Sequence, residues 1–178
     1  RKKVLIIGLG GVGGYALENI VRCGILNITI VDGDIIENTN LNRQIIALNS
    51  TIGQYKVDAF EKRILDINPN CKIKKIKEFI TDENIDLLFN DEIDYLIDAC
   101  DTIKTKELII KKCEEKDIKL ISAMGTGNKL NPEKLKIMDL NKALKSLDLK
   151  ELWECEDYEK EIIEDFEKWF ENETYVQD

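Results

Sequence analysis

The stretch VLIIGLGGVGG at residues 4–14 decides the fold of this chain. Four apolar residues lead into a segment that contains five glycines, and residues 15–18 then open a helical pattern. Gly8, Gly10 and Gly13 satisfy the motif G-x-G-x-x-G between a predicted strand and a predicted helix, which is the context that gives the motif meaning. Small residues let the backbone turn tightly and approach a phosphate, whose charge the helix N-terminus stabilises. By itself the motif predicts a nucleotide-binding site but does not identify the nucleotide.

The composition excludes several classes of protein. The chain has 178 residues, 34% of them charged and 43% hydrophobic, which indicates a soluble, globular protein. No apolar run approaches the roughly 20 residues that span a bilayer, so we expect no membrane partner. Five cysteines without a C-x-x-C pair are typical of a reduced, cytoplasmic protein rather than a disulfide frame or a zinc knuckle. Because histidine is absent, Ser–His and Cys–His nucleophilic catalysis is excluded.

The net charge of −9 is distributed unevenly. Residues 143–178 contain 4 Lys and 13 Asp or Glu, whereas residues 1–142 carry 22 basic and 22 acidic side chains. The whole-chain charge therefore gives no support for nucleic-acid binding. We expect an ATP-binding, Rossmann-like adenylation domain at 1–142 and an acidic, largely helical tail at 143–178. Segment 158–170 has one broad apolar face, which predicts a surface helix that packs on the body or on a partner chain.

Strand and helix patterns alternate through the first 142 residues. Apolar or alternating runs predict strands at 4–7, 27–31, 71–76, 94–99, 119–122 and 135–139. Helical periodicity predicts helices at 15–23, 55–67 and 104–115, and within the tail at 144–152 and 158–170. The alternation implies an α/β, Rossmann-like fold: a mostly parallel sheet with helices on both faces, followed by the acidic helical tail.

Acidic side chains follow the second predicted strand. Asp32 lies 24 residues after Gly8, close to the position at which a βαβ unit places the acid that binds a ribose hydroxyl. Asp34 follows two residues later and can either join the site or cap the following loop. Since ligands of open α/β sheets bind at the carboxyl ends of the strands, we expect both acids beside the glycine turn.

Further polar residues distinguish this pattern from that of a dehydrogenase. Asn40 and Arg43 lie in the polar segment TNLNRQ, Lys56 lies in the next predicted helix, and Asp101 follows the strand at 94–99. A dinucleotide has no evident need for them, whereas Arg and Lys would neutralise the phosphates of a nucleoside triphosphate and an Asp would hold Mg²⁺. The chemistry suggested is attack by a carboxylate on the α-phosphate of ATP, which depends on positioning and charge neutralisation.

Each of these residues also has a structural interpretation. Taken singly, Arg43 and Lys56 would be surface ion-pair residues, and Asp101 could cap the helix that follows it. Cys100 and Cys113 are interpreted as packing residues rather than nucleophiles.

At these residues the chain resembles the ubiquitin-activating-enzyme-like (ThiF/MoeB/HesA) adenylyltransferases. The matching segments, in order, are GLGGVGG (8–14), VDGD (31–34), TNLNRQ (39–44), GQYK (53–56), INP (67–69) and DACD (98–101). Within that superfamily the chain most resembles the tRNA threonylcarbamoyladenosine dehydratases, over roughly residues 3–142. That resemblance depends above all on SAMGTGNKLNPEKLKIMDL (122–140).

The resemblance implies a role for each matching residue. It assigns nucleotide binding to Gly8, Gly10, Gly11 and Gly13, the ribose to Asp32, the phosphates to Asn40, Arg43 and Lys56, and the Mg²⁺ of the adenylation centre to Asp101. The implied reaction is ATP-dependent cyclisation of N6-threonylcarbamoyladenosine at position 37 of ANN-decoding tRNA. A homodimer is implied too, with a sulfur-relay protein as a partner in some bacteria. After Lys142 the chain departs from the family pattern, and its acidic segment would repel tRNA phosphates.

Three alternatives stay open at this point. The first is an adenylyltransferase that activates the C-terminal glycine of a ubiquitin-like sulfur carrier, although the missing C-x-x-C pairs count against its zinc-bearing members. The second is a non-catalytic, nucleotide-binding interaction domain whose acidic tail binds a partner. The third is a dinucleotide-dependent oxidoreductase.

Overall fold

The computed structural model describes residues 2–124 and 137. The chain divides into a compact unit at Arg1–Ala123 and a second unit at Met124–Asp178, and the description below concerns the first. Its strands are β1 (Lys3–Ile7), β2 (Asn27–Val31), β3 (Lys72–Ile76), β4 (Tyr95–Asp98) and β5 (Lys119–Ser122). Its helices are α1 (Gly13–Arg22), α2 (Lys56–Ile67), α3 (Ile85–Leu88) and α4 (Ile103–Glu115), with a 3-10 turn at Asn38–Asn40.

The five strands form one sheet in the order β3-β2-β1-β4-β5. All four neighbouring pairs are parallel, and β1 at the centre pairs with β2 on one side and β4 on the other. This is the order of a Rossmann fold, with its topological switch point between β1 and β4. The predicted α/β class with a parallel sheet is confirmed.

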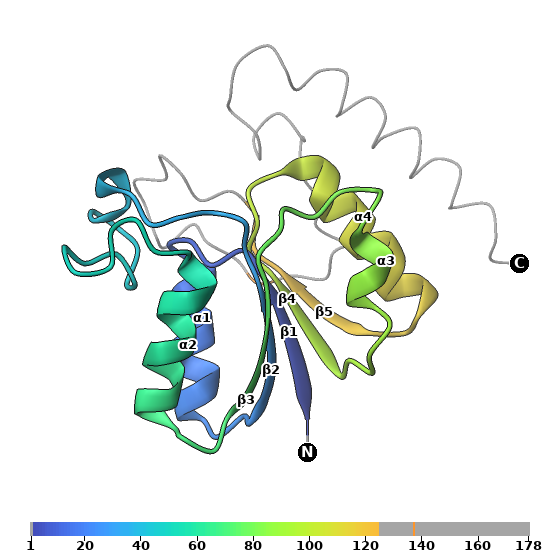
Figure 1. Ribbon diagram of the computed structural model, residues 1–178. Coiled ribbons are helices and arrows are strands. Elements are labelled where there is room, and N and C mark those ends of the chain that lie inside the picture. Colours follow the sequence, from blue (N-terminus) through green and yellow to red (C-terminus); the bar gives the residue numbers. More distant parts are fainter. Residues whose placement is uncertain (1, 125–136, 138–178) are drawn as a thin grey trace, which may run out of the picture. The chain divides into compact units, whose positions relative to one another are not determined.

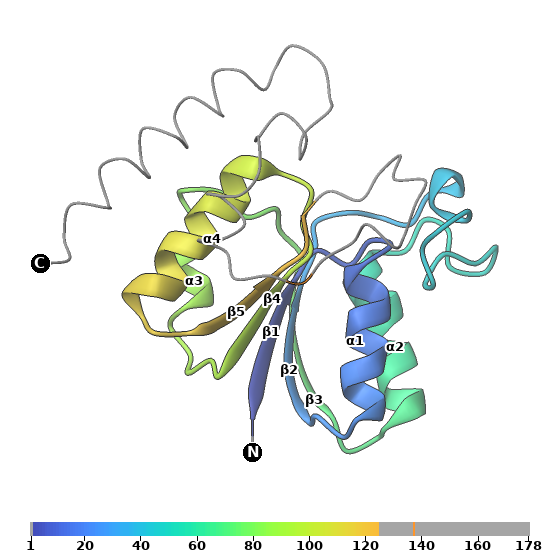
Figure 2. The ribbon, with the colours of Figure 1, turned by 180° about the vertical axis from the view of Figure 1, so that it is seen from behind.

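Helices cover both faces of the sheet, as predicted. Figure 1 shows α1 and α2 side by side on one face and α3 with α4 on the other, and Figure 2 shows the same layers from behind. Two groups of buried apolar residues correspond to these layers. Leu17, Val57 and Phe60 pack with strand residues on the first face, and Leu88 and Ile109 pack with Leu96 on the second.

The element boundaries differ slightly from the predicted ones. Helix α1 begins at Gly13 rather than at residue 15, because two glycines pack in its first turn: a Cβ on Gly14 would stand 2.7 Å from the ring of Phe60 in α2. The single-turn helix α3 was not predicted, since four residues carry too little periodicity to reveal a helix. The strand expected at 135–139 and the tail helices lie outside the described residues, apart from Ile137, which is exposed and irregular. The predicted boundary at residue 142 stays a prediction.

No helix within residues 2–124 is long and apolar enough to cross a bilayer.

Candidate nucleotide-binding site

The glycine turn lies at the switch point of the sheet. Gly8 has φ +86°, and a Cβ there would stand 2.6 Å from the carbonyl oxygen of Ala99, which follows β4. A Cβ on Gly13 would stand 1.8 Å from the carbonyl oxygen of Gly8. These contacts explain why two of the three motif positions accept only glycine: the turn closes on itself and on the end of β4.

The turn leaves space where a ligand would approach. A Cβ on Gly10 would meet nothing nearer than the Gln44 side chain at 3.9 Å. Helix α1 begins directly after the turn without a side-chain cap and without an acidic residue in its first turn. The positive end of its dipole therefore lies at the glycine turn, an arrangement suited to a phosphate.

Asp32 lies where the sequence predicts it, at the end of β2 beside the glycine turn. Its Oδ2 accepts a hydrogen bond from the Leu9 N–H at 2.7 Å, and its Oδ1 accepts one from the Asp34 N–H at 2.8 Å. Burial raises the pKa of the Asp32 carboxyl above its ordinary value, although both N–H groups act in the opposite direction. The carboxylate thus joins the glycine turn to the residues after β2.

Lys56 lies against the two acids rather than on the surface. Lys56 is only 4% exposed. Its Nζ donates to Asp34 Oδ2 at 2.6 Å and lies 3.8 Å from Asp32 Oδ1. The isolated surface ion pair considered for Lys56 from sequence is therefore wrong. The same contact connects Asp34 to the site and gives it a partner other than a loop cap.

Arg43 approaches the glycine turn from the loop that precedes α2. Its backbone oxygen and Cγ would both lie 3.5 Å from a Cβ on Gly11, and its Nη1 donates to the Thr39 carbonyl oxygen at 3.0 Å. Asn40 is buried in the same loop, where its Oδ1 accepts a hydrogen bond from the Glu37 N–H at 3.0 Å. Asn40 thus orders the loop that places Arg43, while the Arg43 guanidinium stays accessible.

Asp101 is exposed and directly follows the Ala99–Cys100 segment on which Gly8 packs. The N-cap of α4 is Thr102 and has no side-chain capping bond, so the helix-capping role considered for Asp101 is wrong. Among residues 2–124, Asp101 makes no ion pair and no three acidic or thiol side chains gather to hold a metal. A single carboxylate nevertheless fits Mg²⁺, which is commonly held by one or two carboxylates together with substrate phosphates.

Cys100 at this edge and Cys113 in the last turn of α4 are packing residues, as predicted. Burial, aided by the nearby Asp98 carboxylate, raises the pKa of both Cys100 and Cys113 to about 12. Both thiols therefore stay protonated at neutral pH, which does not suit a nucleophile.

Gln44 was not singled out from sequence, although it ends the quoted segment TNLNRQ. It is 6% exposed, and its Oε1 is buried without a hydrogen-bond partner in the described part of the chain. Its Nε2 lies beside Gly10. An unpaired buried amide oxygen is costly, so a water or a ligand group that donates a hydrogen bond would stabilise Gln44 at this point.

The sequence also gave no role to Asp98 and Lys106, which form a buried ion pair at the carboxyl end of β4. Asp98 Oδ2 accepts hydrogen bonds from Lys106 Nζ at 2.8 Å and Ser122 Oγ at 2.6 Å, and Oδ1 accepts one from the Cys100 N–H at 3.1 Å. Lys106 Nζ also donates to the Ala123 carbonyl oxygen at 2.9 Å. The sequence does contain one sign of this pair. Lys106 lies on the apolar face of its helix, where a lysine needs a buried acidic partner.

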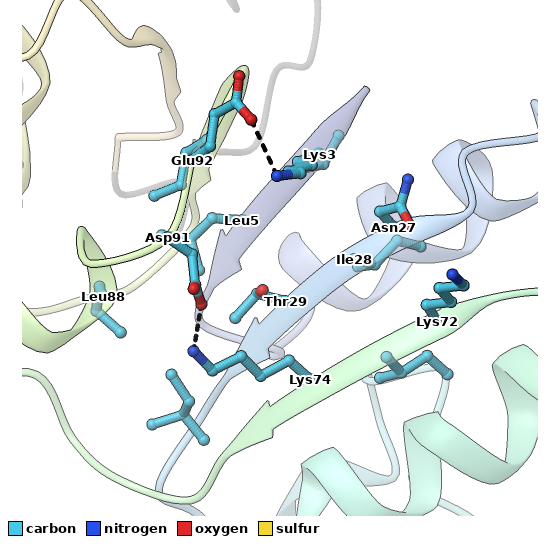
Figure 3. Close-up of a pocket in the computed structure, with 14 residues that line it drawn as sticks. Lys3, Leu5, Asn27, Ile28, Thr29, Lys72, Lys74, Leu88, Asp91 and Glu92 are labelled. Carbon is cyan, nitrogen blue, oxygen red and sulfur yellow. Dashed lines mark hydrogen bonds and ion pairs between the residues drawn. The ribbon is translucent and has the colours of Figure 1, made fainter. Parts of the chain in front are cut away.

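A cavity of about 290 Å³ lies elsewhere, over the amino-terminal halves of β1 to β3 (Figure 3). Four of its five charged side chains form two ion pairs, Lys3 with Glu92 and Lys74 with Asp91. No residue of the glycine turn or of the Asp32–Lys56 cluster lines it. The concentration of polar groups at the opposite ends of the strands identifies that end as the candidate site.

A family comparison agrees with this architecture. The model of the ThiF family matches residues 1–136. The chain belongs to the ThiF family. The resemblance to this superfamily that the sequence motifs predict is therefore confirmed.

Several ThiF-family relatives are named tRNA threonylcarbamoyladenosine dehydratase. The protein of that name from Bacillus subtilis (strain 168) is 46% identical over 139 residues, which cover 78% of this chain and 55% of that protein. The crystal structure of the E. coli protein of that name, in complex with ATP, superposes with a TM-score of 0.75 at 34% identity, covering 78% of this chain and 57% of that one. A yeast adenylyltransferase and sulfurtransferase from Vanderwaltozyma polyspora is 35% identical over 128 residues, or 72% of this chain and 29% of that protein. The chain thus spans about half the length of the dehydratases it matches.

Proposed function

We propose that this chain is the ATP-binding domain of an enzyme that activates a carboxylate, the tRNA threonylcarbamoyladenosine dehydratase. The observation that carries the proposal is the position of Arg43, whose backbone oxygen and Cγ lie beside Gly11, so that an exposed arginine side chain starts next to a glycine turn suited to phosphates. A dinucleotide site has no evident use for that cation. The dehydratase relatives at up to 46% identity, one of them crystallised with ATP, support the choice of nucleotide and of acceptor.

Each site residue receives a role under this proposal. Gly8, Gly10, Gly11 and Gly13 let the backbone and the α1 N-terminus reach the phosphates, and Asp32 accepts the ribose hydroxyls. Arg43 neutralises phosphate charge in the transition state, Asn40 holds the loop of Arg43, and Asp101 holds Mg²⁺. Lys56, with Asp34 as its partner, supplies positive charge at the same edge. Gln44, whose Nε2 lies beside Gly10, can donate a hydrogen bond to a phosphate oxygen.

The proposed reaction has two steps that these residues can support. A carboxylate oxygen of the threonylcarbamoyl group attacks the α-phosphate, and the bond to pyrophosphate breaks. The resulting acyl-adenylate is then attacked by a group of the same modified nucleoside, which closes a ring and expels AMP. The carboxylate oxygen leaves with AMP, so the nucleoside loses one water overall. No side-chain nucleophile is needed, in agreement with a chain that has no histidine.

The proposal also includes the substrate RNA and the protein partners of the enzyme. The substrate is ANN-decoding tRNA in the cytoplasm, the enzyme acts as a homodimer, and a sulfur-relay protein is a further partner. The acidic segment 143–178 lacks the charge for contacting tRNA, so we assign tRNA docking to other parts of the protein.

A second function is favoured by the relatives named adenylyltransferase and sulfurtransferase. In that case the acceptor would be the C-terminal glycine of a ubiquitin-like sulfur carrier. The two functions share the adenylation step and differ in the acceptor that stimulates it. A carrier protein that drives ATP–pyrophosphate exchange, in an assay where modified tRNA does not, would establish this alternative. ATP binding with no turnover on either acceptor would instead indicate a non-catalytic interaction domain.

The direct test uses the full-length protein with ATP, Mg²⁺ and tRNA that carries threonylcarbamoyladenosine. Digestion of the tRNA and mass spectrometry of its nucleosides should show a loss of about 18 Da, the mass of one water. Omitting ATP should abolish the loss. If ATP binds under these conditions and the nucleoside keeps its mass, the dehydratase proposal is wrong.

Arg43→Ala and Asp101→Ala should each lower turnover by about 10²-fold or more, because each removes charge stabilisation from the transition state. For Asp101→Ala the apparent Mg²⁺ requirement should also rise. Arg22→Ala and Asp91→Ala, which remove exposed charges outside the site, are the matched controls and should retain normal rates. Near-normal turnover in either site variant would remove that residue from the proposed mechanism.

A further inference from the structure

Phe79 is a large aromatic side chain that stays 65% exposed in the free protein. It follows β3 by three residues, at the same edge of the sheet as the glycine turn and Asp32. Apolar side chains of this size are costly to leave in water. A ligand that covered this ring would remove apolar surface from water at the edge where the polar site residues gather.

The ring of Phe79 lies face-on against Gly33, the residue between Asp32 and Asp34. The position that a Cβ on Gly33 would take is 2.7 Å from ring atom Cδ2, 2.8 Å from Cε2 and 2.9 Å from Cγ. An approach along the ring edge would leave the two flanking atoms clearly farther away than the middle one. The near-equal distances place Gly33 over one face of the ring, and with 65% of the residue exposed we infer that the opposite face meets solvent.

The backbone around Phe79 is held in place. Its carbonyl oxygen accepts a hydrogen bond from Asn84 Nδ2 at 2.9 Å, and the next residue, Ile80, is buried. The Ile80 carbonyl oxygen in turn accepts a hydrogen bond from the Thr105 hydroxyl at 3.0 Å. The open ring face is thus presented from an anchored segment.

The strand order determines which part of a nucleotide would reach this ring. A phosphate chain at the glycine turn lies over β1, and the ribose lies at Asp32, over β2. The next strand outward is β3, whose end is joined to that of β2 by the Asp32 N–H bond to the Ile76 carbonyl oxygen at 3.2 Å. A base attached to that ribose would therefore extend toward the segment after β3, where Phe79 lies.

We propose that the open face of Phe79 is the stacking platform for the adenine base, with Gly33 required because only a residue without a Cβ lets the ring lie beside Asp32. The assignment rests on the proposed function, since it takes ATP as the ligand of the site. Every base has an aromatic face that can stack on an aromatic side chain.

The experiment compares a ligand that has a base with one that does not. In calorimetric titrations of the full-length protein, Phe79→Ala should weaken ATP binding by about tenfold, the equivalent of about 1.4 kcal/mol. Binding of inorganic tripolyphosphate should stay within about twofold of wild type. Phe79→Trp should restore ATP affinity and Phe79→Leu should not, because leucine keeps apolar surface but cannot stack. Wild-type protein should quench the fluorescence of 1,N6-etheno-ATP, and Phe79→Ala should abolish the quenching.

A matched control and three outcomes keep the two proposals separate. Leu87→Ala removes another exposed apolar side chain, in α3, and should leave both affinities unchanged. Unchanged ATP affinity in Phe79→Ala overturns the stacking assignment and leaves the proposed function standing. Equal weakening of ATP and tripolyphosphate also overturns it, because the effect would then be a general distortion of the site. Failure of the wild-type protein to bind ATP overturns the proposed function itself.

Discussion

Lys106→Met should lower the free energy of unfolding by about 3–5 kcal/mol, the range expected when one partner of a buried ion pair is removed. Asp98 is 0% exposed, and Lys106 is the one cation within ion-pair distance of it among the described residues. Without Lys106, the Asp98 carboxylate would be charged and buried with only the Ser122 hydroxyl and the Cys100 N–H as donors. Urea denaturation followed by circular dichroism measures the loss.

Lys112 in the same helix provides the matched control for Lys106→Met. It pairs with Asp86 and Glu115, both largely exposed, so Lys112→Met should cost less than about 1 kcal/mol. The double variant Asp98→Asn/Lys106→Met should lose less unfolding free energy than its two single variants lose in sum, because it leaves no unpaired buried charge. A cost below about 1 kcal/mol for Lys106→Met would show that water or a rearranged partner compensates Asp98.

Gly13→Ala should destabilise the protein by about 2 kcal/mol or more. Two effects oppose each other at this position, which is the first residue of α1. Alanine is favoured over glycine in a helix by up to about 1 kcal/mol, but its Cβ would stand 1.8 Å from the Gly8 carbonyl oxygen. That atom belongs to the backbone and cannot move without opening the turn, so the clash outweighs the gain in propensity. Thermal and urea denaturation should both register the loss.

Gly10→Ala distinguishes the effect of the glycine turn on stability from its effect on ligand binding. Its Cβ would have space, with the nearest atom at 3.9 Å, so the stability of the free protein should change by less than about 0.5 kcal/mol. Its ATP affinity should fall at least about tenfold, because the new methyl group occupies the side on which a phosphate would approach. The proposed assignment of the turn would be wrong if Gly10→Ala bound ATP normally, or if Gly13→Ala were as stable as wild type.

Much of the fold could be predicted because its signals are local. A four-residue apolar run before a glycine-rich turn, and the alternation of such runs with helical periodicity, are enough to predict a parallel α/β sheet. The same holds for Asp32, since its distance from Gly8 along the chain is a property of the βαβ unit. Helix α3 escaped prediction because a single turn does not repeat any pattern.

The site was predicted as a set of residues but not as a set of contacts. Sequence placed Lys56 near the acids at the edge of the sheet, but its burial against Asp34 depends on how α2 packs on that edge. The same is true of the helix-capping role considered for Asp101, which the N-cap at Thr102 excludes.

The sequence by itself determined the Rossmann-like order of elements, the glycine turn and the acid after β2, because each follows from the spacing of residues within one βαβ unit. Only the tertiary structure decided that Asp98 meets Lys106, that Gln44 Oε1 is left unpaired, and that Phe79 lies on Gly33 with one face open. Those side chains come from separate crossovers, and their contacts depend on the packing of loops and helices at the sheet edge. Local sequence patterns carry no information about which side chains will face one another across that edge.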